Sequence, residues 1–308
     1  MSKIAFLFPG QGSQFAGMGR SLAEKYPAAR AIFNEADHVV GFSLSKLCFE
    51  GPEEELRLTE NTQPAMLTAS VAAYVVLREL GIEPAFVAGH SLGEYSALVA
   101  AGSIRFSEAV ALVRKRGRYM QEAVPPGTGA MAALLMLPFE RLNSVLSDAA
   151  QGETVTAANL NSPDQVVIAG HTGAVNRAVE GAKAAGARRA QLLPVSAPFH
   201  CPLMRPAQER LKPELEAIEF ADLTIPLVNN WEAREIRTGA DARQGLYEQV
   251  PNPVRWSETV TYLAGRGVTR FVEVGPGRVL TGLLRSIDAT FKGVRFGEAT
   301  DSLDGLTS

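Results

Sequence analysis

A serine held between two glycines carries the clearest chemical signal in this chain. Gly89-His90-Ser91-Leu92-Gly93 matches G-x-S-x-G, with an apolar run at 85–89 before it and a helical pattern at 94–101 after it. On a tight turn between a strand and a helix, bulky side chains in place of the glycines would clash, and the turn lifts the serine hydroxyl clear of the sheet. Ser91 is therefore predicted to be a nucleophile rather than a capping serine. The next backbone N–H, that of Leu92, falls at a helix start, where it stabilises an oxyanion.

A serine hydroxyl needs a base, and the chain has four histidines. His38 lies in a polar helical pattern, His171 reads as a turn residue, and His90 adjoins Ser91 so closely in sequence that the two side chains diverge. His200 lies in a loop fixed by two prolines and follows the serine in sequence, as in α/β hydrolases. Elimination favours His200 as the base; the alternative is a hydrogen-bonded loop histidine without a chemical role.

Composition narrows the class of protein. Of 308 residues, 46% are hydrophobic and 20% charged, and the net charge is −3, a globular balance that demands neither a nucleic-acid nor a membrane partner. The two cysteines, Cys48 and Cys201, have no metal-ligand spacing and form no disulfide framework, which fits a reducing compartment. No signal peptide or membrane span is recognisable, so a cytoplasmic protein without a metal is expected.

The surrounding elements predict an α/β fold with a mainly parallel sheet, because short apolar strands alternate with helices. In the first 126 residues these elements are expected at 4–8, 19–39, 65–80, 85–89, 94–101 and 106–124.

The pattern changes after Pro125-Pro126. The next elements are expected to be a strand at 130–137, a helix at 139–150, strands at 155–160 and 165–170, a helix at 172–185 and a strand at 190–195. This β-α-β-β-α-β order is ferredoxin-like. The sequence therefore predicts a small domain at 127–195 inserted into a larger one at 1–126 and 196–308, which ends with a strand at 271–274.

Eight motifs occur in order along the chain: Pro9-Gly10-Gln11-Gly12-Ser13-Gln14, Asn61-Thr62-Gln63-Pro64-Ala65, Gly89-His90-Ser91-Leu92-Gly93-Glu94-Tyr95, Arg116-Gly117, Asn161-Ser162-Pro163, Phe199-His200, Asn252-Pro253-Val254 and Glu273-Val274-Gly275-Pro276-Gly277. Together they resemble one family, the malonyl-CoA:acyl-carrier-protein transacylases of fatty-acid synthesis and the acyltransferase domains of polyketide synthases. The resemblance implies an α/β-hydrolase-like large domain with a ferredoxin-like insertion and a site between them.

The resemblance also implies the catalytic roles. Ser91 attacks the thioester, and His200 acts first as general base and then as general acid. The backbone N–H groups of Gln11 and Leu92 form the oxyanion hole, and the main-chain carbonyl of Asn252 orients the imidazole in place of an acidic third member.

Substrate choice is implied in the same way. Arg116 binds the free carboxylate of the malonyl group, a role that suits a guanidinium with two parallel N–H donors. From the residues alone, Arg116 reads equally well as part of a solvated basic run at 114–118. Gln63 lines the site, and Phe199 beside the base would crowd a branched α-carbon, which favours malonyl over methylmalonyl. Further basic residues that could attract an acidic carrier protein are Lys183, Arg188 and Arg189.

The activity implied is a ping-pong transfer from malonyl-CoA to acyl carrier protein by a monomer, and the absence of a ketosynthase segment favours fatty-acid synthesis. No bound cofactor is expected: coenzyme A thioester and the phosphopantetheine arm are used as substrates, and Gly275-Pro276-Gly277 lacks the pattern of a nucleotide loop. Two alternatives remain at this stage. One is a serine thioesterase or esterase, which would normally have an acidic residue between serine and histidine; the other is a non-catalytic module that binds a carrier protein.

Overall fold

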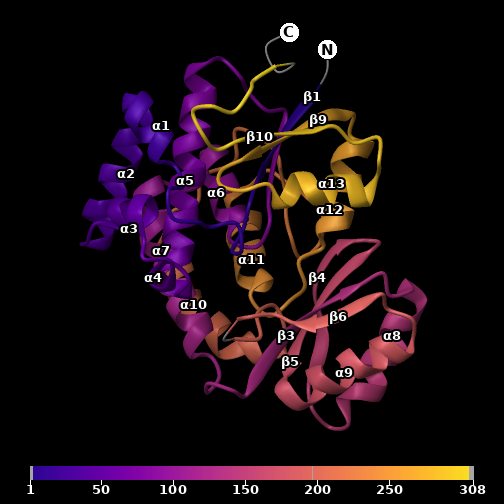
Figure 1. Cartoon of the computed structure of the whole chain (residues 1–308). Helices are drawn as coiled ribbons and strands as arrows, with labels where there is room; N and C mark the ends of the chain where they lie inside the picture. The colour runs from indigo at the N-terminus through magenta and orange to yellow at the C-terminus, as the bar shows by residue number, and fades with distance from the viewer. Residues whose placement is uncertain (1–2, 196, 305–308) are drawn as a thin grey trace.

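A six-stranded sheet forms the centre of the larger part of the molecule (Figure 1). The computed structural model describes residues 3–195 and 197–304, so the expected domain boundary at 196 lies outside the described residues. In sequence order the strands are β1 (Lys3–Phe8), β2 (Phe86–Gly89), β7 (Leu227–Val228), β8 (Glu235–Ile236), β9 (Val268–Val274) and β10 (Gly293–Phe296). Their order across the sheet is β10-β9-β1-β2-β7-β8, and every neighbouring pair is parallel except β7 with β8.

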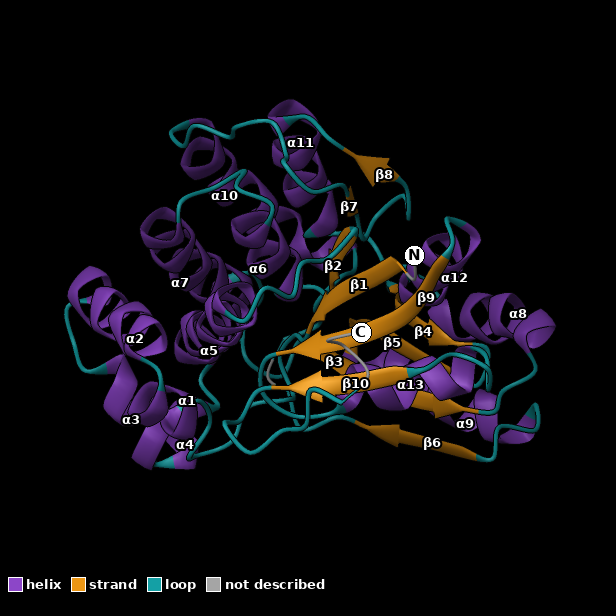
Figure 2. Cartoon of the chain, turned by 90° about the horizontal axis from the view of Figure 1, so that it is seen from above, coloured by secondary structure: helices purple, strands orange, loops and turns teal. Residues whose placement is uncertain are grey.

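Helices cover both faces of this sheet, as the view from above shows (Figure 2). Because side chains alternate along a strand, Phe6 and Phe8 of β1 join one core while Ala5 and Leu7 join the other. The helices on the side of Phe6 and Phe8 are α1 (Arg20–Lys25), α2 (Pro27–Val40), α3 (Leu44–Glu50), α4 (Glu53–Leu56), α5 (Thr59–Glu79), α6 (Gly93–Ala100), α7 (Phe106–Glu122), α10 (Arg205–Glu216) and α11 (Gly239–Gln249). Those on the side of Ala5 and Leu7 are α12 (Trp256–Gly265) and α13 (Val279–Ile287). No helix in the described ranges is both long and apolar enough to cross a bilayer.

A second, four-stranded antiparallel sheet lies below the first in Figure 1. Its elements are β3 (Gly129–Leu135), α8 (Phe139–Ala150), β4 (Val155–Ser162), β5 (Gln165–His171), α9 (Thr172–Ala184) and β6 (Arg189–Leu192), which follow the predicted order. The strands are arranged β4-β5-β3-β6, and α8 and α9 pack on the face of Leu134 and Ile168. The other face, with Met131 and Val167, packs against Cys201 and Phe199, so it covers the loop that contains His200.

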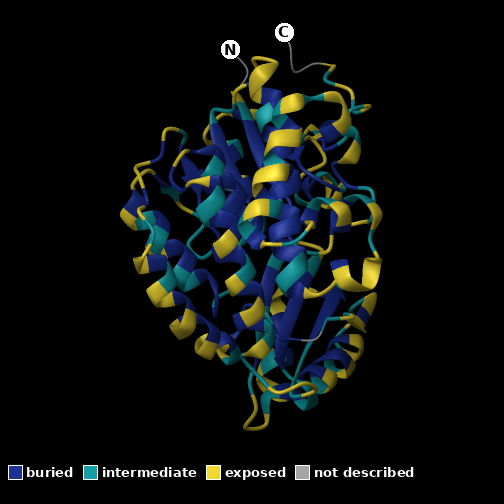
Figure 3. Ribbon diagram, turned by 90° about the vertical axis from the view of Figure 1, so that its left-hand side faces the viewer, coloured by how far each residue is buried: buried dark blue, intermediate teal, exposed yellow. Residues whose placement is uncertain are grey.

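A short stretch of strand-like pairing joins the two parts. Leu160 in β4 donates its N–H to the Val254 carbonyl at 2.9 Å, and Val254 donates to Ala158 at 2.9 Å. The Asn252-Pro253-Val254 motif therefore extends the edge of the smaller sheet. Figure 3 shows buried residues along the strands of both parts and exposed ones on the outer helices.

Two expected helix boundaries were wrong, and in both cases a proline is involved. The helix predicted at 19–39 is two helices, because Pro27 disfavours helical geometry for Tyr26, which is extended at φ −118° and ψ 116°. The helix predicted from residue 65 begins at Thr59, and Pro64 is buried inside it rather than before it.

Candidate active site

The carboxyl ends of β1 and β2 meet where the candidate nucleophile lies. Phe8 is paired with Gly89 in parallel register, so the turns that follow these two strands are neighbours. A Cβ atom on Gly89 would lie 1.9 Å from the Gly93 carbonyl oxygen, and one on Gly93 would lie 2.0 Å from the Phe8 carbonyl oxygen. Only glycine fits at either position. Ser91 between them has φ 51°, the left-handed conformation in which a strained turn presents its side chain.

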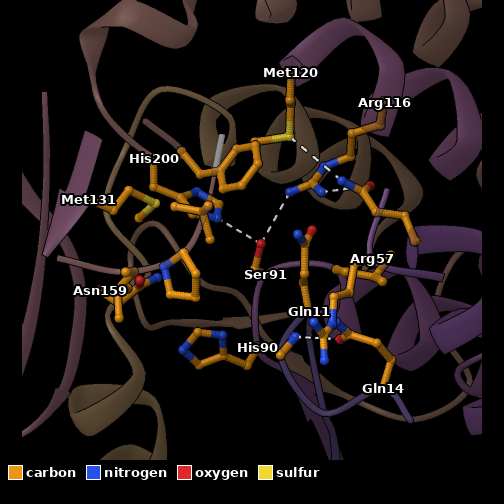
Figure 4. Close-up of a pocket in the computed structure, with 17 residues that line it drawn as sticks. Gln11, Gln14, Arg57, His90, Ser91, Arg116, Met120, Met131, Asn159 and His200 are labelled. Atoms are coloured by element: carbon orange, nitrogen blue, oxygen red, sulfur yellow. Dashed lines mark hydrogen bonds between the residues drawn. The ribbon is translucent and has the colours of Figure 1, made fainter. Parts of the chain in front are cut away.

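Ser91 and His200 are in hydrogen-bond contact, although 109 residues separate them. Ser91 Oγ lies 2.7 Å from His200 Nε2 (Figure 4). His200 Nδ1 lies 2.9 Å from the carbonyl oxygen of Gln249. Because a carbonyl only accepts, Nδ1 carries the hydrogen and Nε2 is left as an acceptor for the serine proton.

The carbonyl that orients His200 differs from the one expected. The carbonyl of Gln249, at the end of α11, is 2.9 Å from Nδ1, and the Asn252 carbonyl also acts to raise the pKa of His200. Gln249 is the last residue of α11, so its carbonyl has no partner in the next helical turn and can accept from His200.

Burial keeps His200 in the state that a base requires. Its side chain is 3% exposed, and desolvation, aided by the nearby charge of Arg116, lowers the pKa of His200 to about 3. The other histidines are engaged elsewhere. His38 is exposed on α2, His171 Nδ1 accepts from the Thr154 N–H at 2.9 Å, and His90 Nε2 lies 2.8 Å from Asn161 Oδ1.

Arg116 is a buried cation that makes no direct ion pair among the described residues, although the charge of the buried Glu94 acts to raise its pKa. It is 2% exposed, whereas Lys115 and Arg118 beside it are exposed, so it does not belong to a solvated run. Its guanidinium donates to three neutral acceptors: Gln63 Oε1 at 2.8 Å, Gln249 Oε1 at 2.9 Å and Ser91 Oγ at 3.2 Å. Burial lowers the pKa of Arg116. A desolvated positive charge attracts a carboxylate strongly because little hydration remains to be lost.

A close crossing of two helices brings Arg116 and Gln63 together. A Cβ atom on Gly117 in α7 would lie 2.6 Å from the carbonyl oxygen of Thr59 in α5. The two backbones approach this closely only because Gly117 has no side chain, and the adjacent residue, Arg116, therefore reaches across to α5.

These side chains surround one pocket of about 590 Å³. The sequence-predicted residues that line it are Gln11, Gln63, Ser91, Leu92, Arg116, Phe199 and His200, and Asn252 does not. Met131 and Asn159 reach it from the smaller sheet, so both parts of the fold form the site. Within residues 3–195 and 197–304, no cluster of His, Cys, Asp or Glu could hold a metal ion.

The sequence reasoning missed lining residues such as Arg57, Met120, Met131 and Asn159, and also Glu94, Asn230 and Gln249 behind the pocket wall. Asn230 Oδ1 accepts from the Ser91 N–H at 2.7 Å, and Gln249 Nε2 donates to the Ser91 carbonyl at 3.0 Å. Glu94 follows the glycine of the serine motif, and Gln249 lies three residues before Asn252, so adjacent motifs were the available signal.

A serine–histidine pair at the carboxyl edge of a parallel sheet is the arrangement shared by α/β enzymes that use a nucleophilic serine. The family model described as an acyl transferase domain matches residues 5–295. The chain belongs to this acyl transferase family.

Individual relatives agree with that assignment. The malonyl CoA-acyl carrier protein transacylase of Bacillus subtilis (strain 168) is 52% identical over 293 residues, which cover 95% of this chain and 92% of that protein. An acyl carrier protein S-malonyltransferase from Vibrio cholerae has a TM-score of 0.95 at 48% identity, covering 97% of this chain and 98% of its own. A malonyl-transacylase in complex with its type II PKS acyl-carrier protein has a TM-score of 0.94 at 49% identity and covers 96% of each chain.

Proposed function

We propose that this protein transfers the malonyl group from malonyl-CoA to the phosphopantetheine thiol of acyl carrier protein, through a malonyl ester on Ser91. The observation that carries the proposal is the buried guanidinium of Arg116, which lies 3.2 Å from Ser91 Oγ and has no carboxylate in direct hydrogen-bond contact among the described residues. A malonyl group bound as an acyl ester at Ser91 would supply that carboxylate. The malonyl transacylase names of the relatives above support the same substrate.

The proposed chemistry begins with a proton transfer. His200 Nε2 accepts the proton of Ser91 Oγ, and the oxygen attacks the thioester carbonyl of malonyl-CoA. The tetrahedral intermediate collapses, His200 returns the proton to the departing coenzyme A sulfur, and malonyl remains on Ser91. The carrier-protein thiol then reverses these steps, with His200 as base toward that thiol, and leaves as the malonyl thioester.

Two backbone N–H groups are proposed to stabilise the intermediate. Gln11 follows β1, Leu92 follows Ser91, and both line the pocket. No protein acceptor is found for either amide hydrogen among residues 3–195 and 197–304, whereas the Ser91 N–H is already bonded to Asn230. Two donors that keep their hydrogens available cost no reorganisation when negative charge develops on the carbonyl oxygen.

The group that orients His200 favours transfer to a thiol over hydrolysis. His200 Nδ1 contacts the Gln249 carbonyl and not the carboxylate typical of a hydrolase triad. This feature supports the transferase over the thioesterase alternative.

Substrate choice is proposed to depend on Arg116, Gln63 and Phe199. Gln63 Oε1 holds one guanidinium nitrogen of Arg116, so it positions the carboxylate clamp. The half-buried ring of Phe199 lines the same pocket and would crowd a methyl branch on the α-carbon. A pocket that discriminates by one methyl group supplies about 1–3 kcal/mol, so partial preference for malonyl over methylmalonyl is expected.

The large part is proposed to be an α/β-hydrolase-like domain of residues 1–126 and 196–308, and the small part a ferredoxin-like domain of residues 127–195. The strand order β4-β5-β3-β6 and the elements between these strands support the second assignment. A cytoplasmic monomer is proposed for the whole chain.

Intact-mass analysis tests the covalent step. Protein mixed with malonyl-CoA alone should gain the mass of one malonyl group, and Ser91→Ala should gain none and transfer none. Cys201→Ser, which alters a buried thiol beside His200, is the matched control and should still be labelled. When acyl carrier protein is added, the malonyl group on Ser91 should be transferred to the carrier thiol rather than released to water as malonate. A wild type without added mass, or a fully labelled Ser91→Ala, would show that the covalent mechanism is wrong.

A further inference from the structure

Glu94 is a fully buried acid three residues after the nucleophile, and the mechanism above gives it no task. It lies in the first turn of α6. Glu94 Oε2 accepts from Gln249 Nε2 at 2.8 Å and from the Asn230 N–H at 3.0 Å. The other oxygen, Oε1, has no hydrogen-bond partner among the described residues. Burying a carboxyl group costs free energy because the group loses its hydration. A buried carboxyl with an unpaired oxygen therefore calls for a functional explanation.

Gln249 joins Glu94 to both reactive groups of the site. Its side-chain amide has two unlike ends: Oε1 accepts from Arg116 at 2.9 Å, and Nε2 donates to Glu94. Its backbone carbonyl accepts from His200. If the amide were reversed, its NH₂ group would face the Arg116 guanidinium, and two donors would oppose each other. Three acceptors favour the orientation in which Gln249 holds Arg116: Glu94 Oε2 at 2.8 Å from Nε2, the Ser91 carbonyl at 3.0 Å and Asn230 Oδ1 at 3.2 Å. Glu94 makes the shortest of these contacts and is the only carboxyl group among the acceptors.

The second contact of Glu94 leads to the serine itself. Asn230, whose N–H is bonded to Glu94, donates from Nδ2 to the Gly89 carbonyl and accepts at Oδ1 from the Ser91 N–H at 2.7 Å. These bonds secure the strained turn on both sides of His90. One carboxyl group thus supports, through two amide side chains, the backbone of the nucleophile and the cation of the pocket.

We propose that Glu94 is a positioning residue for malonyl selection, which acts through Gln249 to aim Arg116 at the acyl group on Ser91. The inference rests on the proposed function. Glu94 touches neither substrate nor the reacting atoms. Burial raises the pKa of Glu94 to about 7, opposed by its hydrogen bonds with Gln249 and Asn230 and by the charge of Arg116. Oε2 can accept these bonds whether the carboxyl is ionised or neutral, so the neutral isostere glutamine should perform the same task.

The test compares acylation of Ser91 by malonyl-CoA and acetyl-CoA, because only malonyl has a carboxylate for Arg116. Glu94→Ala removes the acceptor, so the ratio of kcat/KM for malonyl over acetyl should fall by roughly 10-fold or more. Most of the loss should be in KM for malonyl-CoA. Glu94→Gln should keep the ratio within about threefold of wild type, since it restores an acceptor of the same length.

Glu273 provides a matched control, since it too is fully buried and accepts two backbone N–H groups, those of Leu280 at 3.0 Å and Thr281 at 2.8 Å. It does not line the pocket. Glu273→Ala should lower stability without changing the malonyl-to-acetyl ratio. If Glu94→Ala does not fold, Glu94→Asp withdraws the carboxyl by one methylene and should lower the ratio in the same direction.

The outcomes separate the two proposals. Suppose that wild type acquires a malonyl ester, and that Glu94→Ala and Glu94→Asp both keep the wild-type ratio of kcat/KM for malonyl-CoA over acetyl-CoA. The positioning role is then overturned while the proposed function stands. The positioning role is overturned equally if Glu94→Gln loses as much selectivity as Glu94→Ala, or if Glu273→Ala shifts the ratio by the same amount. If wild type acquires no malonyl ester, the proposed function itself is overturned. In a double-mutant cycle, adding Glu94→Ala to Gln249→Met should change the malonyl-to-acetyl ratio of kcat/KM little further, because Glu94 acts through Gln249.

Discussion

At the scale of single residues, the buried charge of Arg116 sets how the protein should discriminate among acyl groups. Replacing Arg116 with alanine leaves a malonyl carboxylate without a partner in a desolvated pocket, so kcat/KM for malonyl-CoA should fall by about 10²-fold or more. Acetyl-CoA, which lacks the carboxylate, should lose much less. A competition assay between the two thioesters measures the effect.

Lysine at the same position is the informative control. Arg116→Lys keeps a positive charge but cannot donate through a planar fork to Gln63 and Gln249 together, so it should give an intermediate malonyl preference. Equal losses of malonyl and acetyl transfer in Arg116→Ala would instead assign Arg116 a structural role.

The burial of His200 determines the pH range over which the base works. A histidine with its ordinary pKa would lose activity below about pH 6.5. Because the pKa of His200 is lowered to about 3, the imidazole stays neutral, and the rate of Ser91 acylation should be flat from about pH 5 to 8. His200→Ala should be slower by roughly 10²–10⁴-fold throughout. Rapid-quench measurements of acylation would contradict this if the wild-type rate fell tenfold per unit below pH 6.5.

At the scale of helices and strands, sequence patterns predicted the elements that precede and follow the serine, because apolar periodicity and glycines there act locally. The loop that contains His200 was also recognised, from its prolines. The resemblance placed the carbonyl that orients His200 three residues too far along the chain, at Asn252 rather than Gln249. Local patterns did not predict the amides of Asn230 and Gln249, since each meets Ser91 from a distant element. The antiparallel strand β8 has only two residues, Glu235 and Ile236, too few for an apolar pattern to emerge.

The crossing of α5 and α7 gives a prediction at this scale. In Gly117→Ala the new methyl group would meet the Thr59 carbonyl at 2.6 Å, so the helices must separate. We expect a loss of about 1–3 kcal/mol in the free energy of unfolding, as for other overpacked cores, and a fall in malonyl transfer because Arg116 shifts with its helix.

Gly282→Ala is the matched control, since a Cβ atom at this interior position of α13 meets nothing within 4 Å. That variant should gain about 0.5–1 kcal/mol, as alanine usually does over glycine in a helix. Urea unfolding measures both variants, and equal stabilities would rule out the close-crossing explanation.

At the scale of the whole molecule, the pocket exists only where the two parts of the chain meet. Ser91 and Arg116 come from the larger part, while Met131 and Asn159 come from the smaller sheet. The residue patterns predicted both sets of elements, and the family resemblance implied a site between them. The pairing of Val254 with β4, which joins the two parts, was not predicted. The smaller sheet covers the loop that contains His200, whereas Glu94 is enclosed by Asn230 and Gln249 of the larger part. The burial of both groups couples the titration of the site to the stability of the fold.

His200 and Glu94 change the free energy of unfolding in opposite directions as the pH falls. The pKa of His200 is about 3 in the native protein and near 6.5 in an unfolded chain, so between these values the unfolded state binds more protons and acid lowers the free energy of unfolding. Burial also lowers the pKa of His90, which acts in the same direction. The pKa of Glu94 is raised from 4.5 to about 7, so between those values the native state binds more protons and acid raises the free energy of unfolding.

Between pH 6.5 and 4.5 the effects of Glu94 and His200 on the free energy of unfolding should therefore offset each other. Replacing one of the two residues should reveal the pH dependence that the other contributes. Glu94→Gln should lose stability more steeply than wild type as the pH falls, with an added slope of up to about 1.4 kcal/mol per pH unit, the value for one proton. His200→Gln should show the opposite change in slope. Urea unfolding of the three proteins at half-unit steps from pH 4.5 to 7.5 measures these slopes. Parallel curves for all three would mean that neither group titrates differently in the folded and unfolded states.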